Sequence, residues 1–171
     1  VLLVVLGLGA CTGNGFVVEP VIEDIFASIQ RNPHAFNGLM RCKRDNDYIY
    51  RHALAVSALM ISLARQMRLP PAQIREAGMA GLLMDVGIGL LPVDLSQYGG
   101  DYRNLAPEIL NQHIMLGYEY LHAGGGISAA VLDVVLNHHE LMDGTGYPNK
   151  MAGERIDMFS RMAGICDAYD S

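Results

Sequence analysis

Six histidine and aspartate side chains recur beside apolar residues along the chain: His52, Asp85, His113, His138, His139 and Asp167. A buried imidazole or carboxylate needs a partner that offsets its lost hydration, and a metal ion bound by several of them satisfies them together. Imidazoles mixed with carboxylates, without thiolates, favour iron, manganese, zinc or nickel over calcium or copper(I). The pattern therefore predicts a site for one or two divalent ions.

A carboxylate such as that of Asp85 is able to join two ions. Two ions bridged by a carboxylate can activate water at neutral pH and stabilise charge on a phosphoryl oxygen, so Asp85 is the expected catalytic residue. A lone histidine is more often a hydrogen-bonded group without a metal. His34 and His122 are therefore not expected to be metal ligands. Neighbours such as His138 and His139 diverge by about 100° on a helix, so spacing alone leaves open whether they share an ion.

Helices are expected to position these side chains. Apolar residues at helical spacing predict a helix over residues 48–68, which Pro70 stops and which turns His52 inward. A second helix runs from Pro71 to near Asp85, just before glycines break it. Further helices are expected over residues 108–122, from a cap at Ser128 to His138, and from about Phe159 through Asp167.

The first 45 residues are expected to form a separate N-terminal segment. Residues 1–18 read as a short strand and a glycine-rich loop, and helical spacing begins only after Pro20. The apolar run before Cys11 superficially looks like a lipoprotein leader, but at about ten residues it is too short to span a membrane. We therefore expect an all-α bundle over residues 46–171, preceded by the short segment 1–45.

Composition narrows the class of protein. With 171 residues, 51% of them hydrophobic, the chain is long enough for one compact domain. A net charge of −6 without a run of Lys or Arg argues against DNA or RNA as a partner, whereas a small anion held by metal ions is compatible. Cys11, Cys42 and Cys166 lie far apart, which favours a reducing cytoplasmic location over disulfides.

A resemblance to a known family rests on a long motif. Residues 138–148 read HHELMDGTGYP and closely resemble the HHExxDGxGYP signature of the HD-GYP family, cyclic-di-GMP phosphodiesterases of the HD superfamily. The segment 50–52, His113 with Gly117, and the segment 167–170 look like further family elements. The resemblance therefore covers most of the chain. Because the family usually continues with a further helix, the domain is expected to be truncated at its C-terminus.

The resemblance implies roles for individual residues. His52, Asp85 and Asp167 would hold one metal ion, and Asp85, His113, His138 and His139 would hold a second, with Asp85 as the bridge. A loop with Arg161 would shape a pocket for guanine or phosphate and offer a surface to partners; its residues are Gly144, Thr145, Gly146, Tyr147 and Pro148. The two glycines would in any case supply turn geometry.

The sequence departs from the family at three positions. Met84 replaces the histidine of the His-Asp pair, and a thioether is a poor ligand for these ions. Ile88 replaces a lysine that is thought to orient phosphate or water, which removes a cation that would stabilise the transition state. Tyr48 stands where some members carry an extra glutamate, which argues against a third metal ion.

Two functions follow and stay open at this stage. We favour an enzyme with weakened activity that hydrolyses cyclic-di-GMP to pGpG or GMP in bacterial second-messenger signalling. The alternative is an inactive HD-GYP domain that binds cyclic-di-GMP or a diguanylate cyclase (GGDEF) domain as a signalling module. Another phosphohydrolase activity or a structural role is a third interpretation, since fold alone does not decide function, and a dimer is left open.

Overall fold

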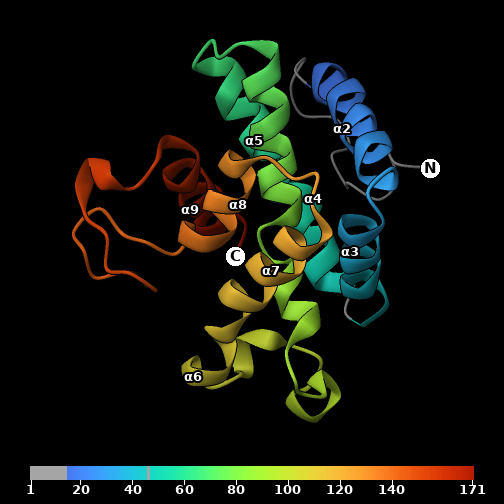
Figure 1. Ribbon diagram of the computed structural model, residues 1–171, viewed down its shortest axis with the longest axis vertical. Coiled ribbons are helices and arrows are strands. Elements are labelled where there is room, and N and C mark those ends of the chain that lie inside the picture. The colour runs from blue at the N-terminus through green and yellow to red at the C-terminus, as the bar shows by residue number, and fades with distance from the viewer. Residues whose placement is uncertain (1–14, 46) are drawn as a thin grey trace.

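The chain is built from helices, as a computed structural model describing residues 15–45 and 47–171 shows (Figure 1). The α-helices are α2 (Gly15–Gln30), α3 (Pro33–Asp45), α4 (Asp47–Gln66), α5 (Pro71–Leu83), α6 (Pro107–Leu110), α7 (Gln112–Gly124), α8 (Ala129–Asn137) and α9 (Met158–Asp170). Short 3-10 helices are η1 (Val86–Leu90), η2 (Leu95–Tyr98), η3 (Tyr102–Asn104) and η4 (Gly153–Arg155). Across these two ranges no β-strand forms, and the predicted all-α class is confirmed.

Helices α4 and α5 form the centre of the bundle. The Ser57 hydroxyl on α4 donates a 2.7 Å hydrogen bond to the Gly78 carbonyl on α5. A Cβ atom at Gly81 would lie 2.9 Å from the Ser57 Cα, so glycine allows the two backbones to approach closely. In Figure 1, α2 and α3 lie on one side of this pair and α8 and α9 on the other. Within the described chain, no helix has both the length and the apolar character needed to cross a bilayer.

The N-terminal helices differ from the prediction. α2 begins at Gly15 and continues through Pro20, so the expected loop at Gly15 and the helix start after Pro20 are wrong. The proline fits because its fixed φ is helical, although it gives up one backbone hydrogen bond. The predicted strand falls on residues outside those described. The domain boundary near residue 45 stays a prediction, and Ile22, Ile25 and Ile29 of α2 share the main core with α4 and α5.

The predicted continuous helix over 108–122 is also wrong. α6 ends at Leu110 and α7 begins at Gln112. The Leu110 carbonyl accepts a 2.6 Å hydrogen bond from Nδ1 of His113, a side-chain contact that ends the first helix and fixes the imidazole. The predicted cap at Ser128 is confirmed. Its hydroxyl accepts a 3.3 Å hydrogen bond from the Val131 N–H at the start of α8.

Candidate metal centre

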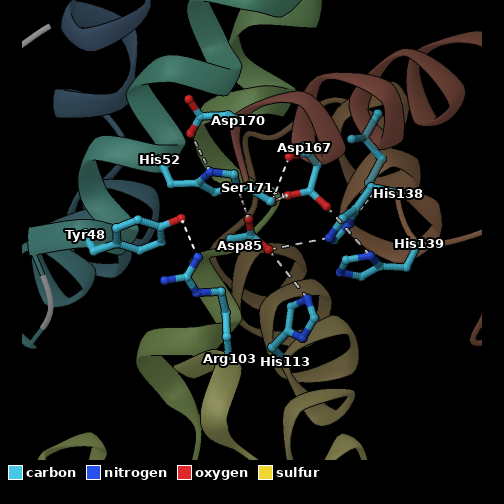
Figure 2. A network of polar contacts seen from close by, with 11 residues as sticks. Tyr48, His52, Asp85, Arg103, His113, His138, His139, Asp167, Asp170 and Ser171 are labelled. Carbon is cyan, nitrogen blue, oxygen red and sulfur yellow. Dashed lines mark hydrogen bonds and ion pairs between the residues drawn. The ribbon is translucent and has the colours of Figure 1, made fainter. Parts of the chain in front are cut away.

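Asp85 lies at the centre of the histidine and aspartate side chains (Figure 2). It follows α5 at the start of η1 and is only 5% exposed. Its Oδ1 lies 3.5 Å from Nε2 of His113 and 3.4 Å from Nε2 of His138. Its Oδ2 lies 3.6 Å from Nε2 of His52. The two oxygens of one carboxylate therefore face two different groups of side chains.

The six side chains singled out from the sequence come together from five parts of the chain. Two groups have donor atoms close enough for one metal ion each, within 4.8 Å of one another: Asp85, His113, His138 and His139, and His52, Asp85 and Asp167. These are the sets that the family resemblance implied. His138 and His139 lie in the same group, with 4.1 Å between their ring centroids. His34 and His122 pack against tyrosine rings and belong to neither group.

Hydrogen bonds behind the imidazoles orient them. Nδ1 of His113 donates to the Leu110 carbonyl at 2.6 Å, and Nδ1 of His138 donates to the Val134 carbonyl at 3.0 Å. Nδ1 of His52 lies 2.7 Å from Oδ2 of Asp170. Each contact leaves Nε2 of the ring facing Asp85, which is how a surrounding layer usually fixes metal-binding histidines.

Asp170 was not among the residues predicted for the site. The sequence does give one indication of its role, because Asp170 follows Asp167 by three residues and both carboxylates therefore lie on one face of α9. Asp167 contacts the other nitrogen of the same ring, with 2.9 Å between its Oδ1 and Nε2 of His52. The pair therefore holds the His52 imidazole from both sides.

Two buried nitrogen atoms indicate that the cluster is suited to a metal ion. Among the described residues, Nε2 of His113 and Nε2 of His138 are buried without a hydrogen-bond partner. Leaving such an atom unpaired costs about 1–3 kcal/mol. Their separations of 3.4 and 3.5 Å from the Asp85 oxygen are compatible with ligands of one ion that binds each of them at about 2.0–2.2 Å. These residues are therefore able to bind a divalent metal ion.

The charge states of Asp85 and His139 suit metal binding, whereas the proton on His52 opposes it. Burial raises the pKa of Asp85, but the surrounding histidines, led by His138, outweigh burial and hold that pKa well below its usual range. Burial lowers the pKa of His139 to about 2, with a further contribution from His138. Burial also lowers the pKa of His52, but its contacts with Asp167 and the neighbouring carboxylates raise it to about 9. Near neutral pH the centre thus presents an ionised Asp85, a neutral His139 and a protonated His52.

The predicted loop folds back onto this centre. The Tyr147 ring stacks on His139, with 4.8 Å between ring centroids and 21° between planes. The Tyr147 N–H donates to the His139 carbonyl at 3.2 Å, and the Tyr147–Pro148 peptide bond is cis. A Cβ atom at Gly146 would collide with the Leu141 backbone nitrogen, so only glycine fits there. Thr145 donates to Asp143 through its N–H and hydroxyl, and Gly144 adopts a φ of +79°.

A small cavity of about 130 Å³ lies at the centre, and four of the six candidate ligands line it. It is lined by Asp85, Ile88, Tyr102, Arg103, Leu110, His113, His139, Asp167 and Ser171. The predicted loop residues and Arg161 are not part of this lining. Arg161 instead lies on α9, where its Nε is buried and has no hydrogen-bond partner within the described chain.

The three divergent positions carry apolar or aromatic contacts. Met84 is fully buried in the main core rather than lining the cavity. Ile88 is 3% exposed, packs in the smaller apolar cluster and lines the cavity. The Tyr48 ring is stacked parallel to His52, with 6.2 Å between centroids. The group formed by His52, Asp85 and Asp167 therefore has three candidate ligands, against four in the other group.

Comparison with known proteins relates this arrangement to a family. A model described as an HD domain matches residues 21–171. The chain is 42% identical over 151 residues to cyclic di-GMP phosphodiesterase PA4108 of Pseudomonas aeruginosa, covering 88% of this chain and 36% of that protein. It is 30% identical over 111 residues to the cyclic di-GMP phosphodiesterase response regulator RpfG of Xanthomonas campestris pv. campestris, covering 64% and 29%. The chain therefore spans about a third of the length of these relatives.

The fold is shared with a solved structure. An HDG"Y"P protein from Bdellovibrio bacteriovorus superposes with a TM-score of 0.61 at 23% sequence identity, over 90% of this chain and 52% of that one. This likeness independently supports the arrangement of helices around the centre.

Proposed function

Because the chain is an HD-GYP domain of the HD domain family, we propose that it is a metal-dependent phosphodiesterase domain that hydrolyses cyclic-di-GMP to pGpG or GMP. The names of the relatives support this substrate, since both PA4108 and RpfG are cyclic di-GMP phosphodiesterases. The reducing cytoplasm is the proposed location, in keeping with the free thiols of Cys42 and Cys166.

The position of Asp85 carries the proposal. Its two oxygens face separate ligand groups, an arrangement suited to two ions joined by one carboxylate. We propose two divalent ions, drawn from iron, manganese, zinc or nickel, because the donors are imidazoles and carboxylates. When bound, such ions supply Lewis acidity, which lowers the pKa of a water molecule and offsets charge on the phosphoryl oxygens.

The chain's own residues prepare the site for this chemistry. Asp85 keeps its charge although it is buried, and the hydrogen bonds behind His52, His113 and His138 hold their rings in place before any ligand arrives. Such preorganisation lowers the reorganisation needed during the reaction. Among the residues that the structure describes, the group of His52, Asp85 and Asp167 has three candidate ligands rather than four, which predicts weaker binding at that group and a reduced rate.

The loop from Gly144 to Pro148, with Arg161, is proposed to contribute to substrate or partner binding. Tyr147 covers His139 and is suited to flank a bound nucleotide. Next to the loop, Leu141 and Met142 are 53% and 54% exposed. This apolar surface supports the proposal of a protein partner such as a diguanylate cyclase (GGDEF) domain.

The test is a hydrolysis assay on protein purified without chelators and loaded with Mn²⁺ or Fe²⁺ under anaerobic conditions. Chromatography is expected to show pGpG or GMP from wild type and from the control His122→Gln, which alters a histidine outside both groups. Asp85→Asn is expected to abolish turnover. Wild-type protein that binds cyclic-di-GMP without forming product would contradict the proposal and favour the inactive signalling module.

A further inference from the structure

The cavity at the metal centre has one Lys or Arg side chain in its described lining. Arg103 is the only Lys or Arg there, whereas Asp85 and Asp167 contribute carboxylates. Ile88 lines the same cavity but is apolar. Ile88, at the position where the family resemblance implies a lysine, therefore lines the same cavity as the Arg103 guanidinium. Ile88 lies on η1 and Arg103 on η3.

Arg103 is held in a defined orientation. Its Nε and Nη2 donate to Asp101 at 2.9 and 2.8 Å, and its backbone N–H donates to the same carboxylate at 2.9 Å. The guanidinium lies over the Tyr48 ring, 4.7 Å from the centroid, with Nη1 3.4 Å from the Tyr48 hydroxyl. These contacts leave an N–H on each of the two Nη atoms for a ligand. The side chain is therefore positioned before any ligand binds.

We propose that Arg103 binds a phosphate group of the substrate and so supplies the cation that Ile88 cannot. This inference rests on the proposed phosphodiesterase function. Figure 2 shows the Arg103 side chain rising toward the cluster on the side of Tyr48, with Asp85 beyond it. Arg103 and four of the candidate metal ligands, Asp85, His113, His139 and Asp167, line the same cavity of about 130 Å³. A guanidinium suits this role because its planar set of donors matches two phosphate oxygens and stays protonated at any working pH.

Tyr48 helps to position the Arg103 guanidinium. A tyrosine at position 48 offers an aromatic face and a hydroxyl to the guanidinium, whereas a glutamate there would add a second carboxylate to the one that Asp101 already supplies. Asp101 holds the opposite edge of the guanidinium. Tyr48 and Asp101 thus hold the guanidinium at the cavity wall without occupying all of its donors.

The experiment compares Arg103→Gln and Arg103→Lys with the control Arg75→Gln. Arg75 is a matched control because its side chain is 52% exposed and pairs with Asp24 at 3.0 Å, against 50% and 2.8 Å for Arg103 with Asp101. Each metal-loaded variant is measured for metal content, for the Kd of cyclic-di-GMP at low temperature and for initial rates. Arg103→Gln is expected to keep its metal and to lose about ten- to hundredfold in Kd and in kcat/KM. Arg103→Lys should recover part of that loss, and Arg75→Gln should stay within about twofold of wild type.

Two results would overturn the role of Arg103. One is a Kd and a kcat/KM of Arg103→Gln within about twofold of wild type; the other is loss of bound metal in that variant, which would indicate a structural role. If wild-type protein neither binds nor hydrolyses cyclic-di-GMP, the proposed function fails by itself. In that case the phosphate-binding role of Arg103 is tested by titrating the variants with inorganic phosphate. Weaker phosphate binding by Arg103→Gln than by Arg75→Gln supports this role, and equal binding refutes it.

Discussion

Asp170 stands behind the metal centre and acts on it through His52. Its carboxylate lies 2.7 Å from Nδ1 of that ring and fixes which nitrogen faces Asp85. We expect Asp170→Asn to weaken metal binding at the His52, Asp85 and Asp167 group by about ten- to hundredfold, the usual effect of removing such a supporting residue. The four-ligand group should keep its ion. Stepwise Mn²⁺ titration measures both affinities, with the exposed Asp24→Asn as control, and unchanged binding at both groups would disprove the role of Asp170.

His52 also predicts how metal binding depends on pH. Burial lowers its pKa, but the contacts with Asp167 and the neighbouring carboxylates raise it to about 9, so the metal-free protein carries a proton there at pH 7.5. Metal binding needs the neutral ring and must displace that proton. Affinity at this group should therefore rise as the pH increases from 7 toward 9.

Calorimetry measures this proton directly. Metal titrations at pH 7.5 in two buffers with different ionisation enthalpies should differ by an amount that corresponds to release of a proton. The His52→Ala variant provides the control, since it has no ring to deprotonate at this position. Heats that do not depend on the buffer in wild-type protein would contradict the protonated state.

At the residue scale, the sequence identified the six side chains that lie together, but not the residues that support them. The ligands were recognisable because histidine and aspartate stand out beside apolar residues at helical spacing. Arg103 is an ordinary charged residue in the sequence, and Asp170 is marked there only by its spacing from Asp167. Their roles follow only from tertiary placement, which brings Asp170 to a ring 118 residues away and Arg103 to Tyr48, 55 residues away. Metal binding by the six side chains stays a prediction.

At the element scale, Glu140 anchors the loop that covers His139. It is 5% exposed, and its carboxylate accepts hydrogen bonds from the backbone N–H groups of Asn149 at 2.6 Å and Met151 at 2.8 Å. Glu140→Gln keeps the shape of the side chain but removes the charge and one acceptor. We expect it to lower the free energy of unfolding by about 1–3 kcal/mol.

Urea unfolding measures that loss, and hydrogen exchange locates it. Faster exchange should appear at Asn149 and Met151 before it appears in the core of α4 and α5. The exposed Glu154→Gln, in η4, serves as a control and should remain within about 0.5 kcal/mol of wild type. Equal stability of the two variants would show that Glu140 does not hold the loop.

Periodicity predicted most of the helices, but it could not predict where contacts interrupt or extend them. The helical pattern runs on across residues 108–122, and nothing in it shows that His113 takes the Leu110 carbonyl. The close packing of η1 on α7 is similarly hidden in sequence, where Gly87 appears as a helix breaker. In the structure, a Cβ atom at Gly87 would overlap the His113 carbonyl, so this glycine lets η1 bring Asp85 next to α7.

At the scale of the whole molecule, the metal centre joins parts of the chain that are remote in sequence. His52 on α4 meets Asp167 on α9 across 115 residues, and Asp85 lies between them. A centre that draws ligands from α4, η1, α7, the end of α8 and α9 forms only when these elements pack together. The all-α class could be predicted from the helical periodicity and the family from the motif, whereas the closeness of the two ligand groups depends on this packing.

The number of metal ions per chain tests the central claim most directly. Elemental analysis of protein loaded with Mn²⁺ or Fe²⁺ and freed of excess metal should give about two ions per chain, because Asp85 faces two ligand groups. His52→Ala, which removes a ligand from one group only, should reduce the count to about one ion. A wild-type count of one or none, unchanged by His52→Ala, would contradict a centre in which Asp85 joins two ions.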